Sequence, residues 1–173
     1  QRGGGVISIQ TPGGPIFDAI VFGEREPGRW MAGSNGFVRT RSFSGPPEIQ
    51  ASRQPVHFAI TYSSDGTITG YRNGRLYGKA YKTGFQRYDA RRAEIVFGMR
   101  HAPAGGNKML AARILEARLY DRVLPPQAIA AAAGQPSTFV PLRKLLASMT
   151  PAQRTRHAEL TQQFDSLLVI QRG

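Results

Sequence analysis

The chain has 173 residues and contains no cysteine. Disulfides, thiolate zinc sites and cysteine nucleophiles are therefore excluded, although this absence leaves the compartment open. No apolar run approaches the roughly 20 residues that a helix needs to cross a bilayer, so the sequence predicts no transmembrane segment. The opening residues Gln1–Gly5 lack the apolar core of a signal peptide. We therefore expect that any targeting segment was removed or never belonged to this chain.

Acidic residues are also scarce, with 11 Asp and Glu against 23 Lys and Arg, which gives a formal net charge of +12. Such a surface attracts polyanions, including nucleic acid, anionic glycans, acidic lipid headgroups and acidic proteins. A solvated basic surface without a specific ligand is the alternative. Because no nucleic-acid recognition motif accompanies the charge, the sequence predicts no specific nucleic-acid partner.

Patterns of catalytic residues are missing as well. Glu24 and Glu26 come nearest to the paired carboxylates of a glucanase, but the residues around them predict a turn. The histidines His57, His101 and His157 are far apart and lack the spacing of metal ligands. The sequence therefore predicts a protein that is not an enzyme and that carries no cofactor and no metal.

What the sequence does contain is a series of short apolar segments separated by turn residues. They alternate apolar and polar side chains, and no helical segment separates them. This arrangement predicts an antiparallel sandwich rather than a parallel α/β sheet. The expected strands cover residues 6–10, 16–22, 29–31, 37–41, 56–62, 67–72, 75–81, 94–99 and 109–120.

The Asn73–Gly74 pair predicts a two-residue hairpin turn, because both central residues of a type I′ turn need positive φ. This turn places Arg72 opposite Arg75, Tyr71 opposite Leu76, Gly70 opposite Tyr77 and Ile68 opposite Lys79. The preceding Asp65–Gly66 turn fits either a two-residue loop or a three-residue loop with a bulge. The two loops place residues 56–60 on opposite faces, so both assignments stay open.

One face of this hairpin carries three cations, which cannot be buried unpaired, so we expect that face to be wet. Tyr77 and Tyr81 would supply stacking rings there, and Arg75 and Lys79, which alternate with them along the strand, would pair with sulfate or carboxylate groups of an anionic glycan. An ordinary exposed sheet face, or a contact with another domain, is the alternative. Trp30 is either a platform at a loop edge or a core anchor. The candidate ligand-binding residues are Trp30, Arg72, Arg75, Tyr77, Lys79 and Tyr81.

Helical patterns replace the strands after Tyr120. A short Ala-rich helix is expected over residues 127–133, and helical spacing continues through Val140, Pro141, Leu142, Leu145, Leu146 and Met149. Thr150 and Pro151 then predict the start of a last helix with a stripe of Leu160, Phe164, Leu167 and Leu168. We expect a module over residues 1–133 and a helical tail or linker over residues 134–173. The apolar stripes of the tail need a covering surface, either each other or a flanking domain.

Several of these segments together resemble a known family. Residues 56–62, Asp65–Ile68 and Tyr71–Gly74 are similar to the hairpin region of laminin-G-like modules in the concanavalin A-like lectin/glucanase group. Phe97–Gly98 and residues 112–126 resemble the closing strand of that family and the helix start after it. Similar runs at residues 17–25, 30–34 and 97–101 occur in modules of planctomycete surface proteins that also carry a cytochrome-c-like domain. The resemblance covers roughly residues 3–133, and residues 142–168 are similar to the helical segment that follows the module.

The resemblance implies an all-β, concanavalin-A-like antiparallel jelly-roll sandwich with a C-terminal helical tail. It implies a non-catalytic binding module for carbohydrate, including anionic polysaccharide, within a larger extracytoplasmic protein of the periplasm or cell surface. A structural or protein-interaction module that docks against other domains or chains of its parent is the alternative.

Two departures from the family affect these expectations. Residues 113–116 lack the Asp that many relatives carry, so metal-assisted sugar binding is not expected. The family's first strands normally precede residues 3–5 and are missing from this sequence, so we expect the sequence to begin inside the module. An edge near Arg113–Tyr120 would then need cover from a separate chain, an upstream fragment, a symmetry mate or the C-terminal helices.

Overall fold

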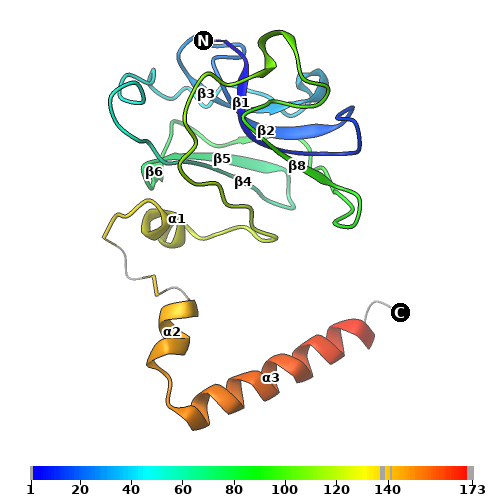
Figure 1. Cartoon of the computed structure of the whole chain (residues 1–173), viewed down its shortest axis with the longest axis vertical. Helices are drawn as coiled ribbons and strands as arrows, with labels where there is room; N and C mark the ends of the chain where they lie inside the picture. Colours follow the sequence, from blue (N-terminus) through cyan, green and yellow to red (C-terminus); the bar gives the residue numbers. More distant parts are fainter. Residues whose placement is uncertain (1, 137–138, 141, 171–173) are drawn as a thin grey trace. The chain divides into compact units, whose positions relative to one another are not determined.

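The computed structural model describes residues 2–136, 139–140 and 142–170, with side chains up to residue 167. The chain divides into two units, Gln1–Pro136 and Ser137–Gly173. The first unit contains two antiparallel four-stranded sheets, drawn as two layers in Figure 1. The second unit is helical.

The first sheet has the strand order β3-β2-β1-β8. Its strands are β1 (Gly4–Gln10), β2 (Phe17–Phe22), β3 (Trp30–Ser34) and β8 (Glu94–Phe97). Phe17, Ala19 and Val21 form a buried cluster on one face of β2. The loop after β8 packs against this cluster, because His101 stacks on Phe17 with ring centroids 4.4 Å apart and Ser8 donates a 2.7 Å hydrogen bond to the Arg100 carbonyl. The 3₁₀ helix η2 (Gly106–Lys108) lies in the same loop.

The second sheet has the order β4-β5-β6, with β7 paired to β5. Its strands are β4 (Phe58–Tyr62), β5 (Thr67–Arg72), β6 (Arg75–Leu76) and β7 (Tyr81–Lys82). Between β4 and β5, the Ser63 amide donates to the Thr67 carbonyl, and Gly66 has a φ of 85°. The loop is therefore the three-residue form with a left-handed glycine, one of the two forms compatible with the sequence.

The Asn73–Gly74 hairpin is confirmed. Both residues have positive φ, 48° and 78°, and the predicted pairs Tyr71–Leu76 and Arg72–Arg75 are present. The Tyr77 amide also donates to the Gly70 carbonyl at 2.8 Å, as expected for the predicted Gly70–Tyr77 pair. Beyond Tyr77 the prediction is wrong, because Ile68 pairs with Tyr81 instead of Lys79. The strand breaks at Gly78, whose φ is 68°, and the Lys79 amide turns away to the Phe43 carbonyl at 2.6 Å.

The main core lies between the two sheets. It contains Trp30, Ala32, Phe43, Ile68 and Tyr77, with Phe58 and Ile60 packed against it. The hairpin face that was expected to be wet therefore carries two core residues, Ile68 and Tyr77, and that prediction is wrong. The cations on this face avoid unpaired burial in two ways: Arg72 has a carboxylate partner, whereas Arg75 and Lys79 are exposed.

Two predicted strands are also wrong. Residues 37–41 form no strand, because the 3₁₀ helix η1 (Asn35–Phe37) and a turn redirect the chain. Residues 109–120 contain only an isolated bridge from Met109 to Met99, and the described chain forms no ladder along the rest of this segment. It is an extended connection that leads to α1 (Figure 1).

Helix α1 (Pro126–Ala132) lies against the Asn73–Gly74 turn, and its Ala128 and Ile129 are buried. A Cβ atom placed on Gly74 would lie 2.8 Å from the Cα of Ala130. Gly74 is thus required twice, for its left-handed φ and for the close approach of α1.

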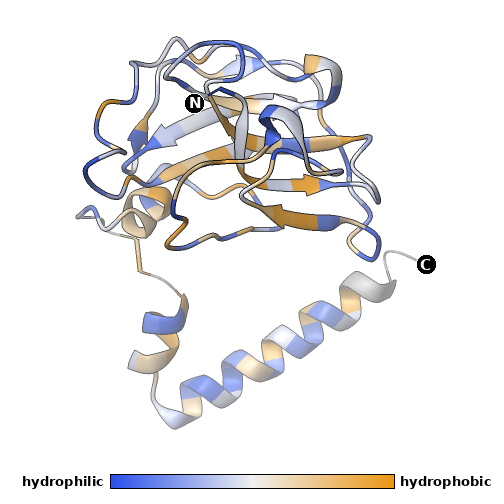
Figure 2. Cartoon of the chain, turned by 45° about the horizontal axis from the view of Figure 1, so that its top comes forward, coloured by the Kyte–Doolittle hydropathy of each residue, from blue (hydrophilic) through white to orange (hydrophobic). Residues whose placement is uncertain are grey.

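The second unit contains α2 (Leu142–Ser148) and α3 (Pro151–Ile170). Thr150 and Gln153 form a reciprocal capping box: the Thr150 amide donates to Gln153 Oε1 at 2.9 Å, and the Gln153 amide donates to Thr150 Oγ1 at 3.3 Å. Leu160, Phe164 and Leu167 are exposed in this unit, and Figure 2 shows apolar and polar residues alternating along α3. Pro141 and the Leu168 side chain lie outside the described residues. Among the described helices, none is long and apolar enough for a bilayer span.

Candidate functional site

The aromatic residues predicted to stack on a ligand lie mostly inside the sandwich. Tyr77 is 2% exposed and Trp30 is 8% exposed. The Tyr77 hydroxyl donates to the Pro46 carbonyl at 2.6 Å and accepts from the Trp30 amide at 3.3 Å. The Trp30 ring stacks on Phe58 with centroids 5.0 Å apart. Trp30 is therefore the core anchor, the second of its two interpretations.

Tyr81 and Arg72 are likewise engaged with the protein. The Tyr81 hydroxyl donates to the Arg39 carbonyl at 3.1 Å, and burial raises the pKa of Tyr81 to about 12. The Arg72 guanidinium donates to both Glu48 oxygens, at 2.7 and 2.8 Å. Arg75 and Lys79 alone of the predicted set are exposed, so a ligand-binding role for them stays a prediction.

Glu48 organises a polar network that was not predicted. Its side chain is only 1% exposed, and besides Arg72 it accepts a 2.9 Å hydrogen bond from the Trp30 indole and one from the Gln50 amide. Burial alone would raise the pKa of Glu48, but these donors outweigh it and lower the pKa to about 2. No sequence pattern predicts the contact between Glu48 and Arg72, because the two residues are 24 positions apart. Glu48 lies in the loop before β4, whereas Arg72 ends β5.

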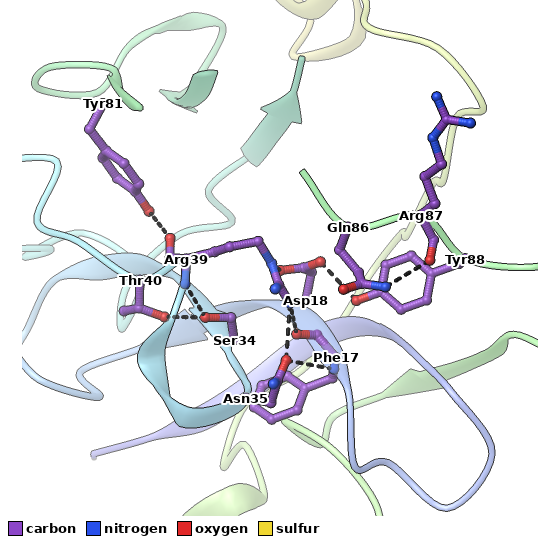
Figure 3. A network of polar contacts seen from close by, with 10 residues as sticks. All are labelled: Phe17, Asp18, Ser34, Asn35, Arg39, Thr40, Tyr81, Gln86, Arg87 and Tyr88. Carbon is purple, nitrogen blue, oxygen red and sulfur yellow. Dashed lines mark hydrogen bonds and ion pairs between the residues drawn. The ribbon is translucent and has the colours of Figure 1, made fainter. Parts of the chain in front are cut away.

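A second polar network lies at the end of the sandwich where β2 begins (Figure 3). Arg39 Nε donates to Asp18 Oδ1 at 2.8 Å, and the two side chains are 9% and 6% exposed. The Arg39 guanidinium also donates to the Phe17 carbonyl at 3.1 Å and to Asn35 Oδ1 at 3.0 Å. Tyr88, from the loop between β7 and β8, donates its hydroxyl to Asp18 Oδ2 at 2.7 Å. Asp18 therefore ties this loop to the sheet.

The protonation states of this network follow from its burial. Desolvation raises the pKa of Asp18, while the hydrogen bonds from Arg39 and Tyr88 oppose that rise. Desolvation and the negative charge of Asp18 raise the pKa of Tyr88, so its phenol stays a donor. The buried Tyr62 hydroxyl interacts with the same groups and has no hydrogen-bond partner among the described residues.

On the solvent side of Tyr88 is a surface cleft of about 220 Å³. This volume lies below the roughly 300–1,000 Å³ of sites for drug-sized molecules, so the cleft suits one small ring or group. The residues of its wall include an aromatic, a hydroxyl-bearing, an acidic and a basic residue. The lining residues of this Tyr88 cleft are Thr11, Pro12, Tyr88, Asp89, Arg92 and Ala93.

The two glutamates considered for catalysis are each paired with an arginine. Glu24 accepts from Arg100 at 2.6 Å, and burial raises its pKa against that attraction. Glu26 pairs with Arg29 at 3.5 Å. The other oxygen of Glu24 is buried, and no described residue is bonded to it. In the described part of the chain, His, Asp and Glu side chains form no group of three suited to a metal ion.

The strands of the first unit form an antiparallel two-sheet β-sandwich, an architecture that lectin-like modules share. The sequence model of the concanavalin A-like lectin/glucanases superfamily matches residues 4–130, most of the first unit. The chain belongs to this superfamily. No match was found among the curated proteins or among the solved structures.

Proposed function

We propose that this chain is a non-catalytic module that binds carbohydrate in the Tyr88 cleft. The observation that carries the proposal is the double engagement of Tyr88. Its hydroxyl is held by buried Asp18 at 2.7 Å, and the same residue is part of the lining of the cleft. An aromatic ring held in place by a buried hydrogen bond offers a sugar an apolar surface at little entropic cost.

The polar groups of the cleft suit the hydroxyl and acid groups of a sugar. Thr11 offers a hydroxyl, Asp89 a carboxylate, and Arg92 a guanidinium that can donate two parallel hydrogen bonds to a carboxylate or sulfate. Arg87 and Arg91 are exposed in the same loop. With the net charge of +12, this supports an acidic polysaccharide as the ligand.

The absence of catalysis is part of the proposal. A retaining glucanase needs two carboxylates about 5–5.5 Å apart that face one substrate. Asp89 is the only carboxylate in the lining of the cleft, and it pairs with Arg91 at 3.4 Å.

The wider setting of the module is proposed from the resemblance alone. We propose that the strands have jelly-roll connectivity and that the module lies outside the cytoplasm. We further propose that it is part of a larger surface protein like those of planctomycetes. In such a parent, docking against other domains or chains is the second candidate function, and the exposed sheet edges favour it.

Calorimetric titration tests the sugar site. We expect an oligosaccharide of uronic acids to bind the chain, and the neutral oligosaccharide of equal length to bind at least about tenfold more weakly. Arg92→Ala should remove this preference. Arg53→Ala, which removes an exposed charge elsewhere, is the matched control and should preserve it. Equal losses in the two variants would show that only net charge matters and would refute the site.

A further inference from the structure

The two sheets cover each other unevenly. One row across the inner face of the first sheet runs from Ala32 through Ile20 and Ile7 to Phe97. Ala32 is 1% exposed, Ile20 and Ile7 are half-buried, and Phe97 is 58% exposed. Ile95, on the next row, is 37% exposed. Large apolar side chains on the inner face of β8 thus lack the cover that the second sheet gives to β3.

The outer edge of β8 also has unused backbone groups. The Gly98 amide donates to the Val6 carbonyl, so Val6 and Gly98 are a hydrogen-bonded pair, and such pairs alternate along an antiparallel ladder. The N–H and C=O groups of Ile95 and Phe97 therefore point away from β1. Within the described ranges, no backbone hydrogen bond reaches them from that side.

The second sheet has a similar edge at β4. The Asn73 amide donates to the His57 carbonyl, which sets the same alternation between β4 and β5. The backbone groups of Phe58 and Ile60 then point away from β5. In the part of the chain that the structure describes, β4 has no neighbour on that side.

The segment of residues 109–123 links these two edges. It begins beside β8, where the Leu110 amide donates to the Gly98 carbonyl, and its Arg118 and Glu116 lie close enough to His57 to affect the pKa of that residue. Four of its large apolar side chains are exposed to solvent: Leu115, Leu119, Tyr120 and Val123 are 59%, 58%, 42% and 47% exposed. We call β8, β4 and this segment the open edge.

We propose that the open edge accepts an extended polypeptide segment of a partner, which adds a strand to the sandwich. Free edges and uncovered apolar side chains are the two features that strand addition uses. Alternate side chains of the added strand would be apolar and would cover Ile95 and Phe97. The others would be acidic, because Glu116 and Asp121 of this segment already pair with Arg118 and Arg122, whereas exposed Arg113 has no carboxylate partner among the described residues and the chain carries a net +12. The same net charge disfavours a second copy as the occupant.

A synthetic peptide tests the proposal on the full chain. The probe is an alternating valine–glutamate peptide of about seven residues, a usual strand length. The matched control is an alternating valine–lysine peptide. We expect the glutamate peptide to bind and to slow hydrogen exchange of the Ile95 and Phe97 amides at least about tenfold, because these amides become strand donors. The lysine peptide should give no such protection.

Ile95→Pro removes one outward N–H without removing a bond to β1, since proline is tolerated at strand edges. We expect this variant, and separately Phe97→Lys, to bind the glutamate peptide at least about tenfold more weakly than the wild type does. Both should still bind oligosaccharide, so failure here is distinct from failure of the Tyr88 cleft. Absent protection, or equal binding of the two peptides, would overturn the proposal. A dimer whose edge amides are already protected would replace the partner with a second copy and would also overturn it.

Discussion

Replacing Glu48 with glutamine removes the charge at the centre of the Trp30–Arg72 network while keeping the shape of the side chain. The folded pKa of about 2 lies well below the ordinary value of 4.5. At about 1.4 kcal/mol per pKa unit, that gap corresponds to roughly 3 kcal/mol of stability. Solvent screening removes part of this, because the partner Arg72 side chain is 21% exposed although that of Glu48 is 1% exposed. We expect Glu48→Gln to lower the free energy of unfolding at pH 7 by roughly 2–3 kcal/mol.

The pH dependence follows from the depressed pKa. The stabilisation is complete above the unfolded pKa of Glu48 and is lost as pH falls towards the folded value of about 2. The difference between the wild type and Glu48→Gln should shrink by roughly half or more between pH 5 and pH 3. Urea unfolding followed by fluorescence measures it directly, because Trp30 is the only tryptophan of the chain.

The matched control is Glu26→Gln, which breaks a partly exposed pair with Arg29 and should cost at most about 1 kcal/mol. Equal destabilisation by the two variants at pH 7 would refute the reasoning. A difference that stays constant down to pH 3 would also refute it.

Three further predictions concern the hairpin, the buried pair and the exposed cations. Gly74→Val should destabilise the fold by more than about 2 kcal/mol, since strain at positive φ adds to a clash with α1; an unchanged melting temperature would contradict this. Asp18→Asn should cost roughly 3–5 kcal/mol because Arg39 is left buried and unpaired, and a loss below about 1 kcal/mol in urea unfolding would count against it. Arg75→Ala with Lys79→Ala should leave stability within about 0.5 kcal/mol, and any weakening of acidic-glycan binding should vanish at high salt. Weakening that persists at high salt would instead indicate a specific site there.

Local chemistry made part of the fold predictable. The Asn73–Gly74 turn depends on two adjacent residues with a shared backbone preference, so it and the first two cross-strand pairs are as expected. The face assignment failed because it treated the cations as a group. Arg72 pairs with Glu48, which lies in a loop 24 residues away in the sequence. The break in the strand at Gly78 allows Tyr77 to be buried in the core while Lys79 remains exposed.

The candidate site could not be predicted for a related reason. Asp18 joins Arg39, 21 residues away, and Tyr88, 70 residues away, and no pattern within a single segment marks such a meeting. Arg39 itself lies in a segment that was expected to be a strand. Once η1 redirects the chain, its guanidinium can reach the start of β2. Long-range pairing between loops is set by the packed sandwich, not by residue spacing.

Chemical-shift mapping of the labelled chain with a uronic-acid oligosaccharide tests the account most directly, because each amide reports its own surroundings. The account predicts saturable shifts centred on the amides of Thr11, Tyr88 and Arg92, with little change at Arg75 and Lys79. Tyr88→Ala should abolish those shifts while the Gly74 amide keeps its folded position. Shifts centred on Arg75 and Lys79, or none at any sugar concentration, would contradict a carbohydrate site at the Tyr88 cleft.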